Sequence, residues 1–169
     1  MRILLAFLAL VLSGLVAGCS LQPMYAGGSS GAVAQGLAGV EVPAIEGRAG
    51  WLVRNALVDR FAAAGAGGGD ATPRYRLDVR LDDRLEGLGV VGDNRVTRER
   101  RVLRSRYQLV DLSTGAILLD ATAGSDAGID VVSSEYATIA AEQTALENLA
   151  REVADQMVTR IALTLRPES

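Results

Sequence analysis

The chain has 169 residues and a formal net charge of −3, and its 17 basic residues are all arginine, because lysine and histidine are absent. These absences exclude an imidazole base or metal ligand, a Ser-His-Asp relay, a Schiff-base lysine and a phosphate-loop lysine. The acidic balance argues against a nucleic-acid-binding protein, and the length allows a single folded domain.

The N-terminus predicts an exported protein. Residues 1–18 begin with Met1-Arg2, continue through an uninterrupted apolar stretch at 3–12 and end in small residues, the pattern of a secretory signal peptide. The apolar stretch is shorter than the roughly 20 residues of a membrane-spanning helix. The only cysteine, Cys19, directly follows Val16-Ala17-Gly18. This order resembles a bacterial lipoprotein signal, in which the cysteine becomes the acylated first residue; a plain signal peptide followed by an unpaired thiol is the alternative.

Acylation of Cys19 would hold the protein on a membrane, because several acyl chains together give stable anchoring without a spanning helix. Ser20 follows Cys19 where aspartate could stand, and in bacterial lipoproteins this implies release to the outer membrane. Residues 26–39 are rich in Gly, Ser and Ala and predict a flexible tether that spans roughly 20 Å. We therefore predict three parts: a signal peptide (1–18), an acylated N-terminus with its tether (19–39), and one folded domain (40–169).

The folded domain is expected to begin with a strand and a helix. Residues 40–45 are a short strand candidate, and Pro43 cannot donate to a ladder, so this strand should lie at a sheet edge. Residues 48–64 predict a helix that the glycine-rich stretch 65–69 ends. Its apolar residues fall on one stripe: Val53, Leu57, Phe61 and Ala64.

Three strands and a second helix follow. Residues 74–86 and 95–111 alternate with period two and are joined by a turn-rich connection at 87–94, and residues 116–125 form the last strand. The residues expected to face the core are Tyr75, Leu77, Val79 and Leu81, then Leu103, Tyr107 and Leu109, then Ile117, Leu119, Ala121 and Ala123. Residues 134–165 predict a helix of ~45 Å. Its stripe is Ile139, Leu146, Leu149, Val153, Met157 and Ile161.

The predicted order is β-α-β-β-β-α. A sheet with one wet face needs its helices on the other face. We therefore predict an α+β fold, a two-layer sandwich in which a four-stranded mixed sheet carries two helices packed on one face.

The wet face of this sheet carries the candidate binding residues, called the arginine stripe: Arg98, Arg100, Arg104 and Arg106, with Arg76 and Arg80 on the neighbouring strand. Guanidinium groups grip phosphate with two donors and tolerate partial burial, so the stripe suits a phosphorylated ligand or the wall of a partner protein.

Cross-strand ion pairing is the alternative interpretation of the stripe. If the hairpin turns near residues 90–91, Asp82 falls opposite Arg98 or Arg100, and Asp78 falls opposite Val102 or Arg104. The arginines outnumber the aspartates on these two strands, which predicts some unpaired positive charge. Asp82, Asp83 and Glu86 could in principle serve a carboxylate hydrolase, but among arginines we expect them to be paired and ionised.

Several short motifs resemble the LptE family of lipopolysaccharide-assembly lipoproteins. Cys19-Ser20-Leu21-Gln22-Pro23-Met24-Tyr25 is similar to the family's start, Cys-Gly-Phe-x-Pro-Leu-Tyr, and departs from it at Ser20, Leu21 and Met24. Arg48-Ala49-Gly50-Trp51-Leu52-Val53-Arg54-Asn55-Ala56-Leu57 resembles the family's first helix, where an Arg-Asn pair precedes a leucine. Tyr107-Gln108-Leu109-Val110-Asp111 and the Tyr136 start of an Ala-rich last helix are also similar.

The resemblance implies a non-enzymatic lipoprotein of the Gram-negative outer membrane, without cofactor or metal, that faces the periplasm. It would plug the lumen of a large LptD-type β-barrel, assist the assembly of that barrel and help deliver lipopolysaccharide to the outer leaflet. Lipopolysaccharide carries phosphates on its lipid A and inner core, which would suit the arginine stripe. An envelope lipoprotein that acts as a structural adaptor for peptidoglycan or another transport complex is the alternative function.

Overall fold

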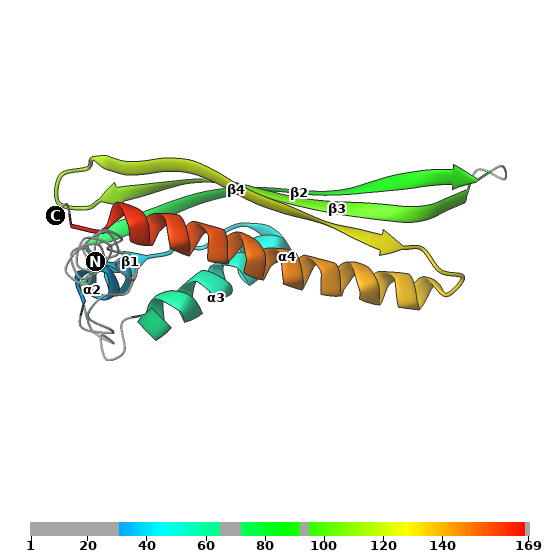
Figure 1. Ribbon diagram of the computed structural model, residues 1–169, viewed down its shortest axis with the longest axis horizontal. Helices are drawn as coiled ribbons and strands as arrows, with labels where there is room; N and C mark the ends of the chain where they lie inside the picture. Colours follow the sequence, from blue (N-terminus) through cyan, green and yellow to red (C-terminus); the bar gives the residue numbers. More distant parts are fainter. Residues whose placement is uncertain (1–30, 65–71, 92–94, 168–169) are drawn as a thin grey trace, which may run out of the picture.

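A computed structural model describes residues 31–64, 72–91 and 95–167. Its elements are α2 (Ala32–Ala38), β1 (Val40–Glu41), α3 (Gly47–Ala64), β2 (Tyr75–Val91), β3 (Arg95–Asp111), β4 (Ile117–Asp130) and α4 (Glu135–Thr164). The strands form one mixed sheet in the order β1-β2-β3-β4, with β1 parallel to β2 and the other pairs antiparallel. The helices lie on one face of this sheet (Figure 1). The predicted α+β class is confirmed, with α2 as an additional helix.

Helix α2 corrects the prediction of a flexible tether that extends to residue 39. Val33, Ala34 and Leu37 are buried, and α2 packs against both α3 and α4. Its N-cap, Gly31, offers no side-chain hydrogen bond, and a seven-residue helix is too short to persist by itself. Tertiary packing therefore holds α2 in place. Cys19 and the first part of the predicted tether lie outside the described residues.

The β2–β3 hairpin is longer than the sequence predicted. β3 has the predicted bounds, whereas β2 continues through Gly87 to Val91, so the strand replaces most of the predicted turn-rich connection. As a result, Asp82 pairs with Arg104 and Asp78 with Gln108, which corrects the predicted register. The correction has a simple cause, because the extension of β2 to Val91 moves the turn further along the chain.

Strand β4 also exceeds its predicted end at residue 125 and runs to Asp130. One of its four predicted core residues is wrong, since Ile117 is 56% exposed. The pairing with β3 shifts by one residue between Leu109 and Val110, which places Ile117 opposite Val110. A shift of one residue reverses the face of a strand side chain, so Ile117 lies on the wet face.

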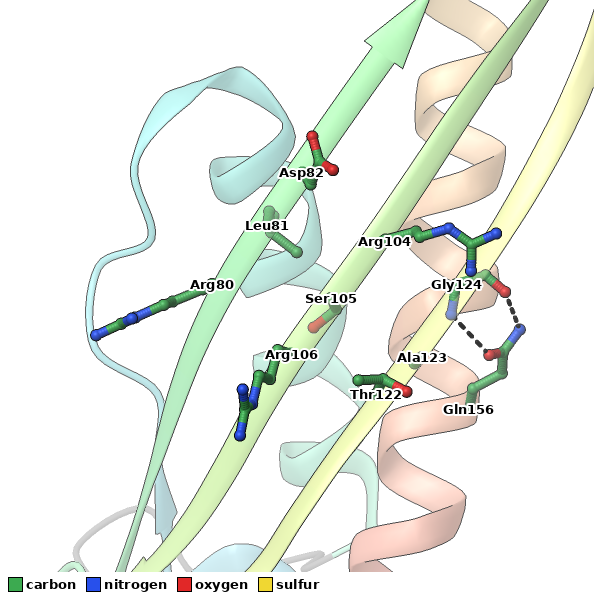
Figure 2. A pocket seen from close by; sticks show the side chains of 10 residues that line it. All are labelled: Arg80, Leu81, Asp82, Arg104, Ser105, Arg106, Thr122, Ala123, Gly124 and Gln156. Carbon is green, nitrogen blue, oxygen red and sulfur yellow. Dashed lines mark hydrogen bonds between the residues drawn. The ribbon is translucent and has the colours of Figure 1, made fainter.

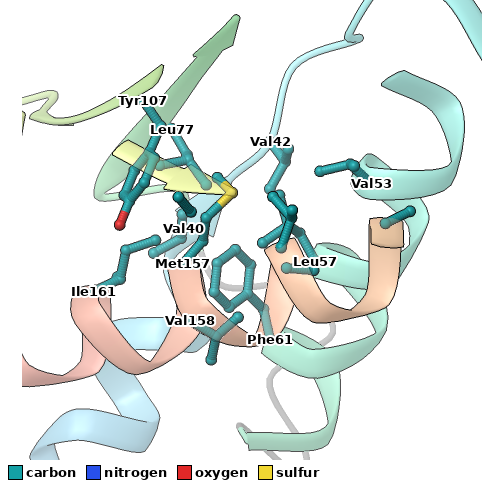
Figure 3. Close-up of a cluster of buried hydrophobic side chains, with 14 of the residues drawn as sticks. Val40, Val42, Val53, Leu57, Phe61, Leu77, Tyr107, Met157, Val158 and Ile161 are labelled. Carbon is teal, nitrogen blue, oxygen red and sulfur yellow. The ribbon is translucent and has the colours of Figure 1, made fainter. Parts of the chain in front are cut away.

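The hydrophobic core lies between the sheet and α4, and α3 closes it (Figure 3). Leu77 and Tyr107 of the sheet meet Met157 and Ile161 of α4, while α3 contributes the predicted Val53, Leu57 and Phe61. Helix α4 is continuous over 30 residues and follows β3 and β4, and α3 packs mainly against α4. Ile139, the first residue of the predicted α4 stripe, is 44% exposed, because it lies beyond the end of this core.

The chain leaves the sheet immediately after β1. Val42 is buried in the core, and its carbonyl oxygen accepts a hydrogen bond of 3.0 Å from Nε of Arg54 in α3. The following turn lies so close to α3 that a Cβ atom at Gly50 would be 2.5 Å from the carbonyl oxygen of Ile45. The short β1 is therefore followed at once by the segment that packs α3 against the core, and among the described residues most of the outer edge of β2 has no neighbouring strand.

Candidate functional site

The candidate site is the face of the sheet opposite the helices. All six residues of the predicted arginine stripe project from this face, four from β3 and two from β2. Strand alternation causes this placement, because even-numbered residues of both strands share the face while Leu77, Leu103 and Leu109 are buried on the other. The six arginines of the stripe therefore share one exposed face of the sheet. The ion-pair partners of each arginine determine whether its guanidinium group is available to a ligand.

Four of the six arginines form ion pairs. The pairs, with their N–O distances, are Arg76 with Asp78 (2.9 Å), Arg98 with Asp130 (3.1 Å), Arg100 with Glu86 (2.9 Å) and Arg106 with Asp120 (3.1 Å). The hydrogen bonds from Arg106 and Gln108 lower the pKa of Asp120 below its usual value. These pairs are exposed, so each contributes only ~0–1 kcal/mol to stability. Their main effect is to neutralise charge.

The sequence reasoning missed the carboxylates that β4 brings to this face. Asp120 and Asp130 pair with Arg106 and Arg98, and Asp126 lies at an outward position between them. The signal was present, because the period-two pattern of β4 continues through Ala127 and Ile129 beyond the predicted end of the strand. These carboxylates neutralise much of the surplus positive charge that was predicted from the sequences of β2 and β3 alone.

Arg80 and Arg104 differ from the other four, because neither forms an ion pair within the described part of the chain. They pair by register with Arg106 and Asp82 respectively, and Asp82 bonds to Arg84 instead. Figure 2 shows that their side chains diverge: Arg104 points toward β4, whereas Arg80 extends away from it across the edge of β2. The structure therefore does not gather the six arginines into one pocket.

An open depression of ≈ 440 Å³ lies between these side chains. Arg104 and Arg106 border it together with Thr122, Gly124 and Gln156 (Figure 2). Two guanidinium groups beside a hydroxyl and an amide offer several hydrogen-bond donors to an anion such as a phosphate. No group of three or more potential metal-ligating side chains occurs among the described residues.

The helix-covered face holds a second polar group that the sequence reasoning did not identify. Arg101 donates to both carboxylate oxygens of Asp83, at 2.9 and 2.7 Å, and to the backbone oxygen of Glu142 in α4 at 3.2 Å. Glu99 lies nearby, and burial followed by the charge of Glu142 raises the pKa of Glu99 above its usual value of 4.5. This group joins the N-terminal half of α4 to the hairpin beyond the apolar core.

The three carboxylates considered for a hydrolase are all held by arginines. Asp82 pairs with Arg84, Asp83 with Arg101 and Glu86 with Arg100, at 2.7–2.9 Å. A carboxyl group whose oxygens already accept hydrogen bonds from a guanidinium group is poorly placed to exchange protons with a substrate. This agrees with the expectation that these side chains are paired with arginines.

Comparison with known protein families identifies the chain. The sequence model described as "LptE: Lipopolysaccharide-assembly" matches residues 37–161, which include every element from β1 to most of α4. The chain belongs to the LptE family. The resemblance inferred from the motifs is thereby confirmed, although Cys19 and the rest of the start motif lie outside the matched range. A search of curated proteins returned no match.

Solved structures of lipoproteins have a similar fold. A candidate lipoprotein from Caulobacter crescentus CB15 is 27% identical, with a TM-score of 0.66, and the match covers 82% of this chain and 100% of that one. The minor lipoprotein from Acinetobacter baumannii is 16% identical (TM-score 0.53, covering 77% and 92%). The rare lipoprotein B from Shewanella oneidensis is 12% identical (TM-score 0.50, covering 74% and 92%). The last two support the fold alone. Within the described residues of this LptE-family chain, no helix is long and apolar enough to cross a membrane.

Proposed function

We propose that the chain is an outer-membrane lipoprotein, acylated at Cys19 and without enzymatic activity, that plugs an LptD-type β-barrel. In this role it assists the assembly of the barrel and helps to deliver lipopolysaccharide to the outer leaflet. The observation that carries the proposal is the match of residues 37–161 to a lipopolysaccharide-assembly family.

The position of α2 shortens the segment between the proposed lipid anchor and the folded domain. Only about a dozen residues separate Cys19 from Gly31, the N-cap of α2, and such a segment reaches at most ~40 Å when fully extended. The domain would therefore stay near the membrane that holds its acyl chains, as a subunit of an outer-membrane barrel must.

Arg104 and Arg106 are the arginines that we propose to contact lipopolysaccharide. Both border the open depression on the sheet face, and Arg104 has no ion pair in the described residues that a ligand would have to replace. Phosphate groups on lipid A and the inner core would accept hydrogen bonds from these guanidinium groups. The ion-paired Arg76, Arg98 and Arg100 would serve as barrel contacts or as solvated surface.

Co-purification tests the proposed partner. The full-length lipoprotein, tagged at its C-terminus, is extracted from its own envelope in mild detergent and purified. We expect a large β-barrel protein to elute with it in a stoichiometric complex, and a Cys19→Ala variant to yield much less of that complex. Recovery of the lipoprotein alone, or with peptidoglycan or another transport complex, would contradict the plug and favour the adaptor.

Arginine substitutions test the proposed ligand separately from the barrel. Arg104→Ala should weaken binding of purified lipopolysaccharide about tenfold, because it removes a charge-assisted contact, while barrel association persists. Arg98→Ala is the matched control, since it removes another exposed arginine, one that is already paired with Asp130. Equal binding by wild type and Arg104→Ala would show that the depression is not the ligand site.

A further inference from the structure

In the described part of the chain, the outer edge of β2 has no neighbouring strand over most of its length. β1 pairs only with Tyr75 and Arg76, and the N–H of Tyr75 donates to the Gly39 oxygen at 3.0 Å. Backbone groups of successive residues point to opposite sides of a strand, so from residue 77 onward the odd-numbered residues direct theirs to the open edge. Among the described residues, no backbone hydrogen bond fills that edge after Arg76.

The edge of β4, at the other side of the sheet, is covered by α4 at Gly124. The side-chain amide of Gln156 in α4 bonds both backbone groups of Gly124, accepting from its N–H and donating to its oxygen, each at 3.2 Å (Figure 2). Ser125 next to it donates a short hydrogen bond to Glu152. An exposed strand edge is a template for pairing with another chain, and α4 interrupts that template on β4 at Gly124.

The side chains along the open edge have a pattern that a second copy of the same strand would match. On the wet face of β2 the charges alternate in sign: Arg76, Asp78, Arg80, Asp82, Arg84 and Glu86. An antiparallel copy centred on Leu81 would place Arg80 opposite Asp82 of the second copy and Asp78 opposite Arg84. Each opposite-charge pair would occur twice by symmetry. Centring the pairing on Arg80 or Asp82 would instead oppose like charges.

The helix-side face of β2 is compatible with the same register. Leu81 would meet Leu81 of the second copy at the symmetry axis, and Leu85, which is 44% exposed, would lie opposite Leu77 of the second copy. Odd-numbered residues would pair with odd-numbered residues, as their outward backbone groups require. Arg80, which lacks an ion pair within the described chain and extends across this edge, would gain a carboxylate partner (Figure 2).

We propose that two copies of the free protein pair through the open edges of β2, antiparallel and centred on Leu81, into one continuous sheet. The charge pattern of residues 78–84 selects a second copy of this chain over other extended segments. The inference goes beyond the proposed function and does not depend on it, because it concerns the protein before it joins any partner.

Cysteine crosslinking tests the register in the full-length lipoprotein, in envelope vesicles and in detergent. Paired residues on neighbouring antiparallel strands have Cα atoms ~5.5 Å apart, within the range of a disulfide. Mild oxidation should therefore join two copies of Leu81→Cys. It should not join two copies of Leu85→Cys, the matched control on the same face, because those residues would be ~27 Å apart. Wild type reports any crosslinking through Cys19.

Exchanging the charges of Arg80 and Asp82 tests whether the alternating charges of β2 hold the two copies together. In the Leu81→Cys background, Asp82→Arg should reduce the crosslinked dimer at least about tenfold, since it opposes Arg80 with an arginine twice. Adding Arg80→Asp should restore the dimer. Light scattering checks the result without any substitution at Leu81. The mass of wild type should rise with concentration, whereas Asp82→Arg with Leu81 intact should remain monomeric. A wild type that is monomeric throughout, equal crosslinking at Leu85→Cys, or a crosslink to a different protein would overturn the proposal.

Discussion

Glu99, on the helix-covered face of the sheet, is a residue whose ionised side chain should destabilise the folded state. It faces Glu142 of α4, and its Oε2 atom is buried without a hydrogen-bond partner in the described residues. The nearby Arg101 is already bonded to Asp83 and to the backbone of Glu142. The half-buried Glu99 therefore has no cation of its own among the described residues, and burial, the charge of Glu142 and a hydrogen bond with the Glu142 side chain raise the pKa of Glu99.

A raised pKa gives a definite sign to the effect of pH on stability. A carboxyl group that is harder to ionise in the folded state stabilises the fold while it is protonated, and this contribution is lost as pH rises through the raised pKa. Glu99→Gln should therefore be more stable than wild type at about pH 7.5, and the difference should vanish toward about pH 4. Thermal unfolding between these values measures it.

The control for this prediction is Glu147→Gln, which removes an exposed carboxylate from the same helix that Glu142 belongs to. Asp111, Asp120 and Asp155 act in the opposite sense, because hydrogen bonds lower their pKa values. Their stabilising contributions are lost as pH falls, so wild type and Glu99→Gln should both become less stable against unfolding in acid. A wild type more stable than Glu99→Gln at about pH 7.5 would show that Glu99 is favourably paired.

At the scale of elements, the contact between α4 and β4 includes the side-chain amide of Gln156, which bonds to both backbone groups of Gly124 at the edge of β4. Gln156→Glu keeps the acceptor for the Gly124 N–H but loses the donor to the Gly124 oxygen. We expect a loss of about 1 kcal/mol in the free energy of unfolding, measured by urea denaturation. Gln143→Glu is the matched control: it creates a glutamate four residues from Glu147, as Gln156→Glu does four residues from Glu152. An equal loss in both variants would mean that repulsion along α4, not the edge contact, is responsible.

Elements with a strong local pattern could be predicted from the sequence, and elements held by distant partners could not. The alternation of residues 95–111 gave the bounds of β3, and the stripe of Val53, Leu57 and Phe61 gave the helix α3 and its buried face. Helix α2 was missed because its glycine- and alanine-rich sequence has no side-chain cap at its N-terminus and gains its burial from α3 and α4.

In the candidate site, too, features set by the local sequence pattern could be predicted and features set by distant partners could not. The face of the arginine stripe was predictable, because it depends on parity along single strands. The partner of each arginine was not, because Asp120 and Asp130 reach Arg106 and Arg98 only through the β3–β4 register and the true length of β4. The one-residue shift at Leu109 and Val110, which turned Ile117 outward, also has no local signal in the sequence.

At the scale of the whole molecule, the apolar core is concentrated at one end. There α2, α3 and the C-terminal half of α4 lie beneath the sheet, whereas at the other end only the hairpin, β4 and the first turns of α4 meet (Figure 1). Leu37, Phe61 and Ile161 are nearly or fully buried at the first end, while the Asp83–Arg101 ion pair lies beyond the core. Stability should therefore be greatest around α2 and decrease toward the hairpin tip.

This distribution makes α2 part of the domain and predicts where a stable soluble fragment begins. A fragment that starts at Gly31 keeps Val33 and Leu37 in the core, whereas one that starts at Val40 uncovers the surfaces of α3 and α4 beneath them. Loss of a buried leucine side chain alone costs ~2–5 kcal/mol, so the shorter fragment should lose at least about 3 kcal/mol in urea unfolding. Leu37→Ala in the longer fragment, with Ala32→Ser as its exposed control, should reproduce much of that loss. Equal stability of the two fragments would show that residues 31–39 belong to the tether and not to the folded domain.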